Sequence, residues 1–468
     1  MGEAPCIGIV GAFGGDEGKG KVVDVLAQNA GCVVRCEGGA NAGHTIRLED
    51  LTFVGHLLPS GAAAGTLCAI ARGVRVDPTQ LLQEVSTYTA PGAGGKSRSL
   101  SLLVDDGAAL SLSWHQRLEM YFERVKEKQV RGTGSTRRGM GPIAATAALR
   151  LNPRVGHLTR PEELRQWLDD FYEAFQPQLA ASGNSVTPTM LADELAALGH
   201  RLAPYIGDVR ARVEQIWRDG KSVVLEGAQG MVLDPYWGTY PYTTQGMCTF
   251  AGLLQGCGLP VSALTDRIGV CKAIATRVGN GPFPSELGDP ALLADEPKVV
   301  DADLDAFARE MLAKINAGHA SDQELGHYLR VRADEYGATT GRHRRTGWLD
   351  GAWLEYFAAV NDPTELALTK LDCLRGLREL KVVTAYELDG RHLPPGTVPA
   401  LASDFARVRP VYQTLPGWSE DISDVTRFDA LPAEARAYIE LVEEIANCPI
   451  RWIGTGPFRE QLIVQPRN

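Results

Sequence analysis

The sequence has few of the features that would place a protein in a membrane or on nucleic acid. No apolar run approaches the roughly 20 residues that a membrane-spanning helix needs, so we expect no membrane segment. The formal net charge is −10 and the pI is near 5.5, which argues against binding nucleic acid through bulk positive charge. The first apolar strand begins by about residue 6 with no basic leader before it, so no signal peptide is visible.

The nine cysteines are scattered along the chain and none forms a CxxC pair. Several of them lie in apolar runs that are typical of buried strands. This spacing does not favour a zinc site, and it is unlike the disulfide frameworks of secreted domains. We therefore expect reduced thiols in the core of a cytoplasmic protein.

Strand-like and helical patterns alternate along the 468 residues, of which 44% are hydrophobic. The alternation predicts an α/β fold with a large, mostly parallel sheet covered by helices. We expect a single large domain over residues 1–468 with smaller excursions. Ligands of such sheets bind beyond the carboxyl ends of the strands. We expect strands at 7–10, 33–35, 100–104, 222–225, 268–272, 366–370 and 380–386, and helices at 78–85, 114–127, 195–219 and 433–446.

Residues 288–325 are polar and acidic at both ends and read as an inserted helical element. Apolar side chains recur at helical spacing between Leu304 and Ile315. Asp301 or Asp303 could cap the start of this helix, and Gly318 could end it. We interpret it as a helix packed on the domain surface, with partner binding as the alternative.

The most informative motif is GAFGGDEGKGK at residues 11–21, between the strand at 7–10 and a helical pattern at 22–28. A glycine-rich turn between a strand and a helix start forms a cradle for phosphate. The spacing from Gly15 to Lys21 fits a Walker A loop, but Val22 stands where the metal-binding hydroxyl should be. Asp16 is unusual in such a loop, because an acid beside phosphate is repelled unless it holds a metal or moves a proton. A structural turn is the alternative.

Two further glycine-rich clusters could bind anions. Residues 38–45, GGANAGHT, place a histidine beside a glycine, where its ring could touch a ligand. A tight turn with the histidine bonded to backbone is the simpler interpretation of this motif alone. Residues 132–142, GTGSTRRGMGP, combine hydroxyls with two arginines, and guanidinium groups bind phosphate and carboxylate in fork geometry. A solvated basic loop is the alternative there.

Three more polar clusters are weak signals individually. EGAQG at 226–230 offers a glutamine amide that suits the edge of a base, or is an ordinary turn after a strand. GATTGRHRRTG at 337–347 has the anion-binding character of the arginine-rich cluster, and the same alternative. TKLD at 369–372 could read guanine through its carboxylate, or form a surface ion pair. Together, the six clusters predict several anionic or polar ligands bound near an acid and a histidine.

The order and spacing of seven strings resemble the adenylosuccinate synthetase family over nearly the whole chain. The strings are GDEGKGK, NAGHT, EGAQG, GTYPY, TRVGNGPFPSEL, GATTGR and TKLD. The resemblance implies a ligase of purine biosynthesis that joins L-aspartate to IMP with hydrolysis of GTP. It also implies a homodimer with shared active sites.

The family mechanism implies catalytic roles for three residues of these strings, Asp16, His44 and Lys19. Asp16 would be the general base that removes the N1 proton of hypoxanthine, after which the 6-oxygen attacks the γ-phosphate of GTP. His44 would donate a hydrogen bond or proton to the phosphate system, and Lys19 would add fixed positive charge. The aspartate amine then displaces the 6-phosphoryl group. The resemblance implies Mg²⁺ as cofactor, with the Asp16 carboxylate and the Gly43 carbonyl as its protein ligands.

The resemblance also implies binding residues for each substrate. For IMP they are Asn41, Thr136, Gln229, Thr244, Val278, Arg342 and, from the neighbouring subunit, Arg150. For aspartate they are Arg138, Thr339, Thr340 and Arg344. For GTP they are Gly15, Glu17, Gly18, Gly20, Lys21, Thr45, Lys370, Asp372, Gly454, Gly456 and Pro457.

The chain departs from the family pattern mainly beside the purine and GTP positions. The departures are Phe13-Gly14 ahead of the first motif, Arg137-Arg138-Gly139, the apolar run at 143–149, residues 245–247, Gly454, Phe458 and the long connection at 288–325. The same ligase chemistry on another 6-oxopurine nucleotide, such as dGMP, is therefore an alternative. A non-catalytic GTP-binding protein is a third, but it predicts loss of Asp16 or His44, and both are present.

Overall fold

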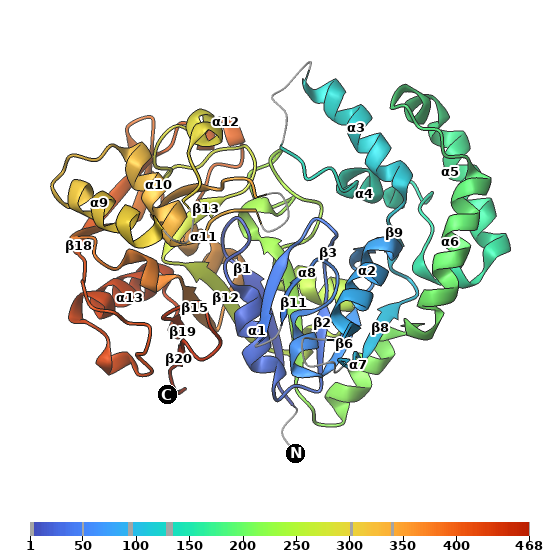
Figure 1. Cartoon of the computed structure of the whole chain (residues 1–468), viewed down its shortest axis with the longest axis horizontal. Helices are drawn as coiled ribbons and strands as arrows, with labels where there is room; N and C mark the ends of the chain where they lie inside the picture. Colours follow the sequence, from blue (N-terminus) through green and yellow to red (C-terminus); the bar gives the residue numbers. More distant parts are fainter. Residues whose placement is uncertain are drawn as a thin grey trace. The chain divides into compact units, whose positions relative to one another are not determined.

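The computed structural model describes residues 4–48, 51–91, 97–127, 134–299, 303–337 and 341–467. The chain forms two compact units, and Figure 1 labels many of their helices and strands. The first comprises Met1–Val10, Lys19–Gln229 and Tyr242–Asp266, and the second Gly11–Gly18, Gly230–Pro241 and Arg267–Asn468. The expectation of one domain over the whole chain stays a prediction.

The first unit is built on a sheet with the strand order β10-β8-β6-β2-β11-β1. The described pairs β10–β8, β8–β6, β6–β2 and β2–β11 are all parallel. Every residue of β1 and β2 is buried, as expected for parallel strands covered on both faces. The bounds are β1 Cys6–Gly11, β2 Cys32–Arg35, β6 Leu67–Ile70, β8 Leu102–Asp105, β10 Ile206–Gly207 and β11 Val223–Gly230.

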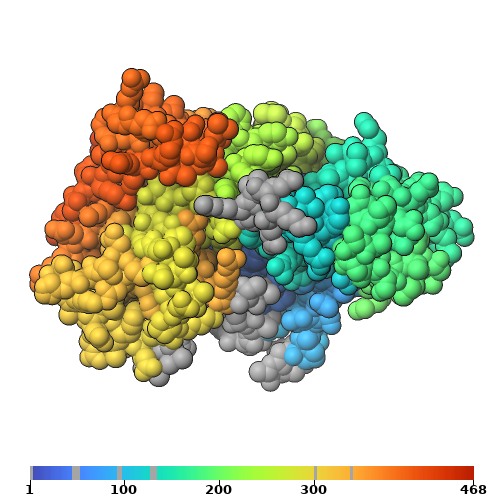
Figure 2. All heavy atoms as spheres, turned by 90° about the horizontal axis from the view of Figure 1, so that it is seen from above, coloured from blue at the N-terminus to red at the C-terminus, as the bar shows by residue number. Residues whose placement is uncertain are grey.

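Eight helices among the described residues accompany this sheet. They are α1 Lys19–Ala27, α2 Pro78–Thr89, α3 Ser113–Glu127, α4 Met140–Ala148, α5 Pro161–Ala181, α6 Pro188–Leu202, α7 Val209–Arg218 and α8 Phe250–Cys257. The long helices α5 and α6, green in Figures 1 and 2, lie side by side. Trp114 of α3 stacks on Phe171 of α5 with ring centroids 5.4 Å apart, which joins these helices to one apolar core.

Small strands complete the first unit. A hairpin pairs β4 (His44–Leu48) with β5 (Leu51–Gly55), and His44 lies opposite Gly55 in its register. The short strands β3 (Gly38–Gly39), β7 (Val74–Val76) and β9 (Ala109–Leu110) form a parallel three-stranded sheet. The hairpin therefore fixes where the histidine of the 38–45 cluster stands.

The second unit holds two sheets. In the first, β12, β15 and β19 are parallel and β20 is antiparallel; the second contains β13, β14, β16, β17 and β18. The strand bounds are β12 Leu264–Lys272, β13 Ile274–Arg277, β14 Arg345–Asp350, β15 Glu365–Thr369, β16 Glu379–Leu388, β17 Arg391–His392, β18 Arg409–Pro416, β19 Ile450–Gly454 and β20 Leu462–Val464. The helices are α9 Leu304–Asn316, α10 Asp322–Arg332, α11 Gly351–Asn361, α12 Ala402–Phe405 and α13 Ala433–Ala446.

The predicted α/β fold with a mostly parallel sheet is confirmed, and each of the seven expected strands is present. The expected helix at 195–219 is wrong as a single element. It is two helices, α6 and α7, with β10 between them. The break is local: Asp208 caps α7 by accepting a hydrogen bond from the Ala211 amide at 2.8 Å, which fixes a new helix start.

The helix expected within residues 288–325 is confirmed as α9, which packs against α10. Asp303 occupies its N-cap position without a side-chain capping bond, and Gly318 follows it with a left-handed φ of 71°. Asp301 lies outside the described residues. All nine cysteines are free and buried, as predicted. Within the described part of the chain, no helix has the length and apolarity that a membrane crossing requires.

Candidate active site

Two of the predicted motifs, at 38–45 and 226–230, lie at the ends of neighbouring strands of the first sheet. Because β2 and β11 are parallel, the 38–45 cluster and the end of β11 lie at the same edge of this sheet, as expected for motifs at strand ends. One local expectation is wrong. Residues 226–230 are not a turn after the strand but the last five residues of β11. This extension carries Glu226 and Gln229 along the strand itself.

His44 lies at the start of β4 in a buried polar environment. Its side chain is 10% exposed, and its Nδ1 lies 3.8 Å from Glu226 Oε1. Burial lowers the pKa of His44, while Glu226 acts in the opposite direction. Neither ring nitrogen has a hydrogen-bond partner within the described residues.

Glu226 is held in place from two directions. Arg35 of β2 donates to Glu226 Oε1 at 3.0 Å, and the Ser60 amide and hydroxyl donate at 2.8 and 2.9 Å. Burial works to raise the pKa of Glu226, but His44 and Arg35 outweigh it and lower the pKa. A fixed, ionised carboxylate therefore stands beside His44.

Gly55 leaves the room that the His44 ring occupies. A Cβ built at Gly55 would lie 2.8 Å from His44 Nε2 and 2.9 Å from Phe53 Cε1. Real Cβ atoms essentially never come so close to a neighbour. The position opposite His44 in the hairpin must consequently be glycine if the ring is to keep this place.

One pair of predicted IMP residues comes together in the first unit, and a third predicted residue, Gln229, lies beside Gly246. Asn41 Nδ2 donates to Thr244 Oγ1 at 3.2 Å, and a Cβ at Gly246 would lie 3.6 Å from Gln229 Oε1. Both amide atoms of Gln229 and the Asn41 Oδ1 are buried without a hydrogen-bond partner in the described structure. A buried amide without a hydrogen-bond partner lowers the stability of the fold. These groups therefore point to a polar ligand that forms the missing hydrogen bonds.

The glycine-rich loop at 11–18 belongs to the second unit. Glu17 is fully buried, and its Oε1 accepts hydrogen bonds from the amides of Phe13 at 3.2 Å and Gly15 at 2.7 Å. Thr369 Oγ1 donates to the Glu17 carbonyl at 2.6 Å. Asp16 takes a left-handed φ of 57° between these bonds. The loop is thus shaped by its own carboxylate, and Asp16 is turned outward.

Asp16 makes an ion pair with a residue of the 337–347 cluster. Its Oδ2 lies 2.7 Å from Arg344 Nη2. Arg344 Nη1 lies 3.0 Å from Glu335 Oε2, and Glu335 Oε1 lies 2.8 Å from Lys272 Nζ. Burial works to raise the pKa of Glu335, but Lys272 and Arg344 outweigh it and lower the pKa to about 2. The structure therefore brings Asp16, the predicted general base, into contact with Arg344, which is predicted to bind the substrate aspartate.

The two strings expected beside guanine follow neighbouring strands. In the β15–β19 pair, Leu368 lies opposite Ile453, one residue before Thr369 and Gly454. Lys370 has a left-handed φ of 61° and donates to the Ala333 carbonyl at 2.6 Å. Asp372 lies in the short helix that follows, Leu371–Leu374. The sheet thus places TKLD next to the start of the 454–457 segment.

The remaining predicted residues divide between helix starts and exposed segments. Lys19, Gly20 and Lys21 form the first turn of α1. Thr136 and Arg150 are exposed, and Val278 is 38% exposed. Arg138 lies near enough to Asp77 to lower its pKa, against a larger effect of burial that raises it. Thr339, Thr340 and the Thr45 side chain lie outside the described residues.

Sequence reasoning missed Gly55, Arg35, Lys272 and Glu335 and gave Glu226 no role of its own. One signal was available: Lys272 interrupts the apolar run from Ile268 to Ile274, and a lysine in a buried strand needs a partner. Nothing in the sequence showed that the partner would be Glu335.

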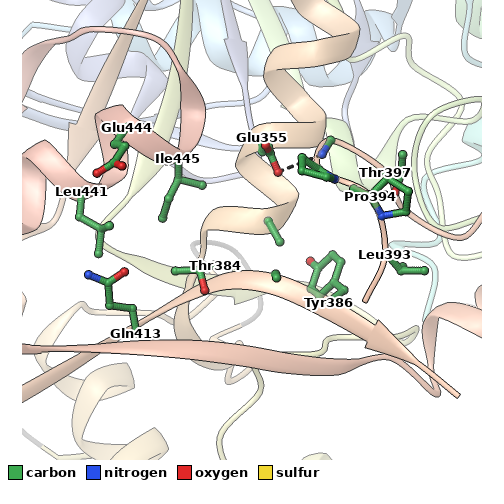
Figure 3. Close-up of a pocket in the computed structure, with 14 residues that line it drawn as sticks. Glu355, Thr384, Tyr386, Leu393, Pro394, Thr397, Gln413, Leu441, Glu444 and Ile445 are labelled. Atoms are coloured by element: carbon green, nitrogen blue, oxygen red, sulfur yellow. Dashed lines mark hydrogen bonds between the residues drawn. The ribbon is translucent and has the colours of Figure 1, made fainter. Parts of the chain in front are cut away.

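A separate cavity of about 330 Å³ lies elsewhere in the second unit, between α11, α13, β16 and residues 393–397 (Figure 3). Glu355 and Glu444 point toward it, and Glu355 Oε2 accepts a hydrogen bond from the Gly396 amide at 2.9 Å. None of the predicted site residues lines it. It is therefore distinct from the candidate site.

A glycine-rich loop between a strand and a helix start, on a mostly parallel α/β fold, is typical of enzymes that bind a nucleoside triphosphate. The chain belongs to the adenylosuccinate synthetase family, whose model matches residues 8–463. Membership makes it a ligase that forms a carbon–nitrogen bond in purine biosynthesis. Enzymes of this family need a divalent metal ion.

Relatives of known name cover nearly the whole chain. It is 37% identical over 469 residues to the adenylosuccinate synthetase of Myxococcus xanthus, covering 98% of both chains. The Thermobifida fusca enzyme is 38% identical over 463 residues, again with 98% of both covered.

Two solved structures are also similar. The fully ligated adenylosuccinate synthetase from Plasmodium falciparum matches with a TM-score of 0.84 at 31% identity, covering 99% of this chain and 100% of that one. The cyanophage S-2L succinoaminodeoxyadenylate synthetase bound to dGMP and dATP matches with a TM-score of 0.55 at 18% identity, covering 100% and 97%. The second likeness concerns the fold alone.

Proposed function

We propose that this chain catalyses the GTP-dependent ligation of L-aspartate to IMP, which gives adenylosuccinate, GDP and phosphate. The observation that carries this reaction is the family match across residues 8–463. The presence of both Asp16 and His44 supports a catalytic rather than a regulatory role. The reaction proceeds in two steps through 6-phosphoryl-IMP.

In the first step, the Asp16 carboxylate takes the N1 proton of hypoxanthine, and the 6-oxygen attacks the γ-phosphate of GTP. His44 donates to the phosphate oxygens, and its unpartnered ring nitrogens support this role. Lys19 adds positive charge from the first turn of α1. In the second step, the aspartate amine attacks C6 and phosphate leaves with the former 6-oxygen. General acid–base help of this kind typically contributes about 10²–10⁴-fold.

The donor atoms on the chain suit Mg²⁺. The Asp16 carboxylate and the Gly43 carbonyl are hard oxygen ligands, which this ion prefers, and Mg²⁺ usually takes only one or two carboxylates from the protein. A Cβ at Gly43 would meet no atom within 4 Å, so there is open space beside this residue. When bound, the ion neutralises charge on the GTP phosphates.

Binding of the three substrates follows the family pattern. Asn41, Gln229 and Thr244 hold IMP, together with Thr136, Val278 and Arg342, and the buried unpartnered amides support this. Arg344, Arg138, Thr339 and Thr340 hold the aspartate carboxylates. GTP is held by residues 15–21 with Thr45, and its guanine by Lys370, Asp372, Gly454, Gly456 and Pro457.

We also propose a homodimer in which Arg150 of each subunit reaches the IMP phosphate in the other. The exposed side chain of Arg150 supports this assignment. The nine buried free cysteines suit a reducing compartment, and we place the enzyme in the cytoplasm for that reason.

A nucleotide panel tests the reaction. The protein is incubated with aspartate, GTP and Mg²⁺, and IMP, dIMP, GMP or dGMP is offered separately while products are followed by mass spectrometry. We expect succinylated product from IMP far above the other three. No product from IMP together with product from dGMP would establish the alternative substrate. No product from any nucleotide would favour a non-catalytic GTP-binding protein.

A further inference from the structure

Lys272 and Glu335 form an ion pair deep inside the second unit. Their side chains are 0% and 1% exposed, and Lys272 Nζ lies 2.8 Å from Glu335 Oε1. The Lys272 ammonium also donates to the Thr276 hydroxyl. A buried ion pair is weak evidence for stability, because desolvating both charges offsets much of their attraction. The pair therefore calls for a reason other than holding the fold together.

The second oxygen of Glu335 carries the contact outward to Arg344. Glu335 Oε2 lies 3.0 Å from Arg344 Nη1, and the Arg344 amide donates to the Glu335 carbonyl at 3.0 Å. Arg344 Nη2 then reaches Asp16 Oδ2 at 2.7 Å. Side-chain exposure rises along this series, from 0% and 1% for the pair to 12% for Arg344 and 32% for Asp16. The Lys272–Glu335 pair is thus fixed in the interior, and Asp16 at the other end of the series faces solvent.

Glu335 binds the Nη1 atom of the Arg344 guanidinium and makes no hydrogen bond with its Nε–Nη2 edge. Arg344 Nε is buried and has no hydrogen-bond partner within the described residues. Nε and Nη2 form one edge of the guanidinium plane, and such an edge binds a carboxylate with two parallel hydrogen bonds. In this structure Asp16 occupies only the Nη2 half of that edge.

We infer that Lys272 and Glu335 are positioning residues that fix the plane of Arg344 so that its Nε–Nη2 edge receives a carboxylate of the substrate amino acid. The inference rests on the proposed function, in which Arg344 binds aspartate. Lys272 holds the Glu335 carboxylate, Glu335 holds Nη1, and the free edge keeps one orientation. A guanidinium without this support would rotate about its flexible stem and lose bidentate geometry.

The test compares two buried carboxylates that each bridge two cations. Glu335→Gln removes the charge that holds Arg344. Glu365→Gln is the matched control, because Glu365 is 2% exposed and pairs with Arg451 at 2.8 Å and Arg467 at 3.2 Å. Steady-state KM is measured for aspartate, IMP and GTP, together with kcat. Titration with succinate, which has both carboxylates but no amine, measures binding without turnover.

We expect Glu335→Gln to raise KM for aspartate and weaken succinate binding by roughly 10–100-fold, since small misplacements of a binding group have effects of that size. KM for IMP and GTP should stay within about threefold of wild type, and Glu335→Asp should recover part of the aspartate affinity. Lys272→Met leaves the Glu335–Arg344 contact in place, so its effect should be smaller. It also serves as the test if Glu335→Gln does not fold.

Two results would overturn the inference. One is a Glu335→Gln enzyme with the same KM for aspartate as Glu365→Gln. The other is an equal rise of all three KM values, which indicates general loosening of the fold. Failure of the proposed function is distinguishable, because wild type would then give no succinylated product while its succinate titration could still be compared with that of the variants.

Discussion

At the scale of single residues, some side chains of the candidate site belong to recognisable sequence motifs. Other side chains of the site lie outside any motif. Asp16 and His44 stand in glycine-rich strings and could be singled out from the sequence. Lys272 and Glu335 are separated by 63 positions and meet only through the tertiary structure. Gly55 has no motif around it, and its role follows from its register opposite His44. Local patterns predict groups that touch ligands better than groups that hold those side chains in place.

Gly55→Ala should lower kcat by roughly tenfold or more, because the added methyl would displace the His44 ring and small displacements of a catalytic group are costly. A Cβ there would lie 2.8 Å from His44 Nε2. KM for GTP and IMP should change little, since no predicted base or ribose contact is removed. Gly207→Ala is the control, because its Cβ would meet only the end of the Leu103 side chain, at 3.2 Å. If Gly55→Ala turned over like Gly207→Ala, the required space around His44 would be disproved.

At the scale of elements, short β-branched runs were reliable signals because buried parallel strands need them on both faces. The helix at 433–446 was predicted with the bounds that α13 has. Errors arose where elements met. Residues 195–219 keep helical spacing across a break that Asp208 creates. Glycines in 226–230 suggested a turn, yet β11 continues through them to Gly230, four residues beyond its last pair with β2, Glu226 with Arg35.

The cap of α11 predicts a pH-dependent stability. Asp350 Oδ1 accepts a hydrogen bond from the Trp353 amide at 3.1 Å, and burial raises the pKa of Asp350 from 3.8 to about 6. Since the folded state holds this proton more tightly than the unfolded state, the carboxyl favours folding below pH 3.8, and this contribution is lost as pH rises through about 6. Asp350→Asn keeps a capping acceptor and cannot ionise.

We therefore expect the unfolding free energy of Asp350→Asn, relative to wild type, to increase between pH 5 and pH 7.5 by on the order of 1–2 kcal/mol. Urea unfolding at several pH values measures this difference, with Asp208→Asn at the exposed cap of α7 as the control. A difference between Asp350→Asn and wild type that stayed constant across this range would contradict the raised pKa.

At the scale of the whole molecule, composition and motif order predicted the fold class and the family, because both depend on many residues at once. The division into two compact units was not predicted. The phosphate-loop motif is continuous in sequence, but Gly11–Gly18 belong to the second unit and the following helix to the first. Such a division depends on which strands each segment packs against, which no local pattern contains.

The shared-site homodimer predicts complementation between two inactive variants. Asp16→Asn and Arg150→Leu should each lose most activity alone. Mixed after mild dissociation, they should recover about a quarter of wild-type activity, because half of the dimers are mixed and each mixed dimer has one intact site of two. Mixing two Asp16→Asn preparations is the control. No recovery, with mixed dimers verified by differently tagged subunits, would contradict a site completed by the neighbouring subunit.

The central claim is that the 6-oxygen of IMP is phosphorylated by GTP and then displaced by the aspartate amine. IMP labelled with ¹⁸O at the 6-position tests this directly when the released phosphate is analysed by mass spectrometry. The account predicts one ¹⁸O atom in each phosphate released and none in the adenylosuccinate. Unlabelled phosphate formed together with succinylated product would contradict it.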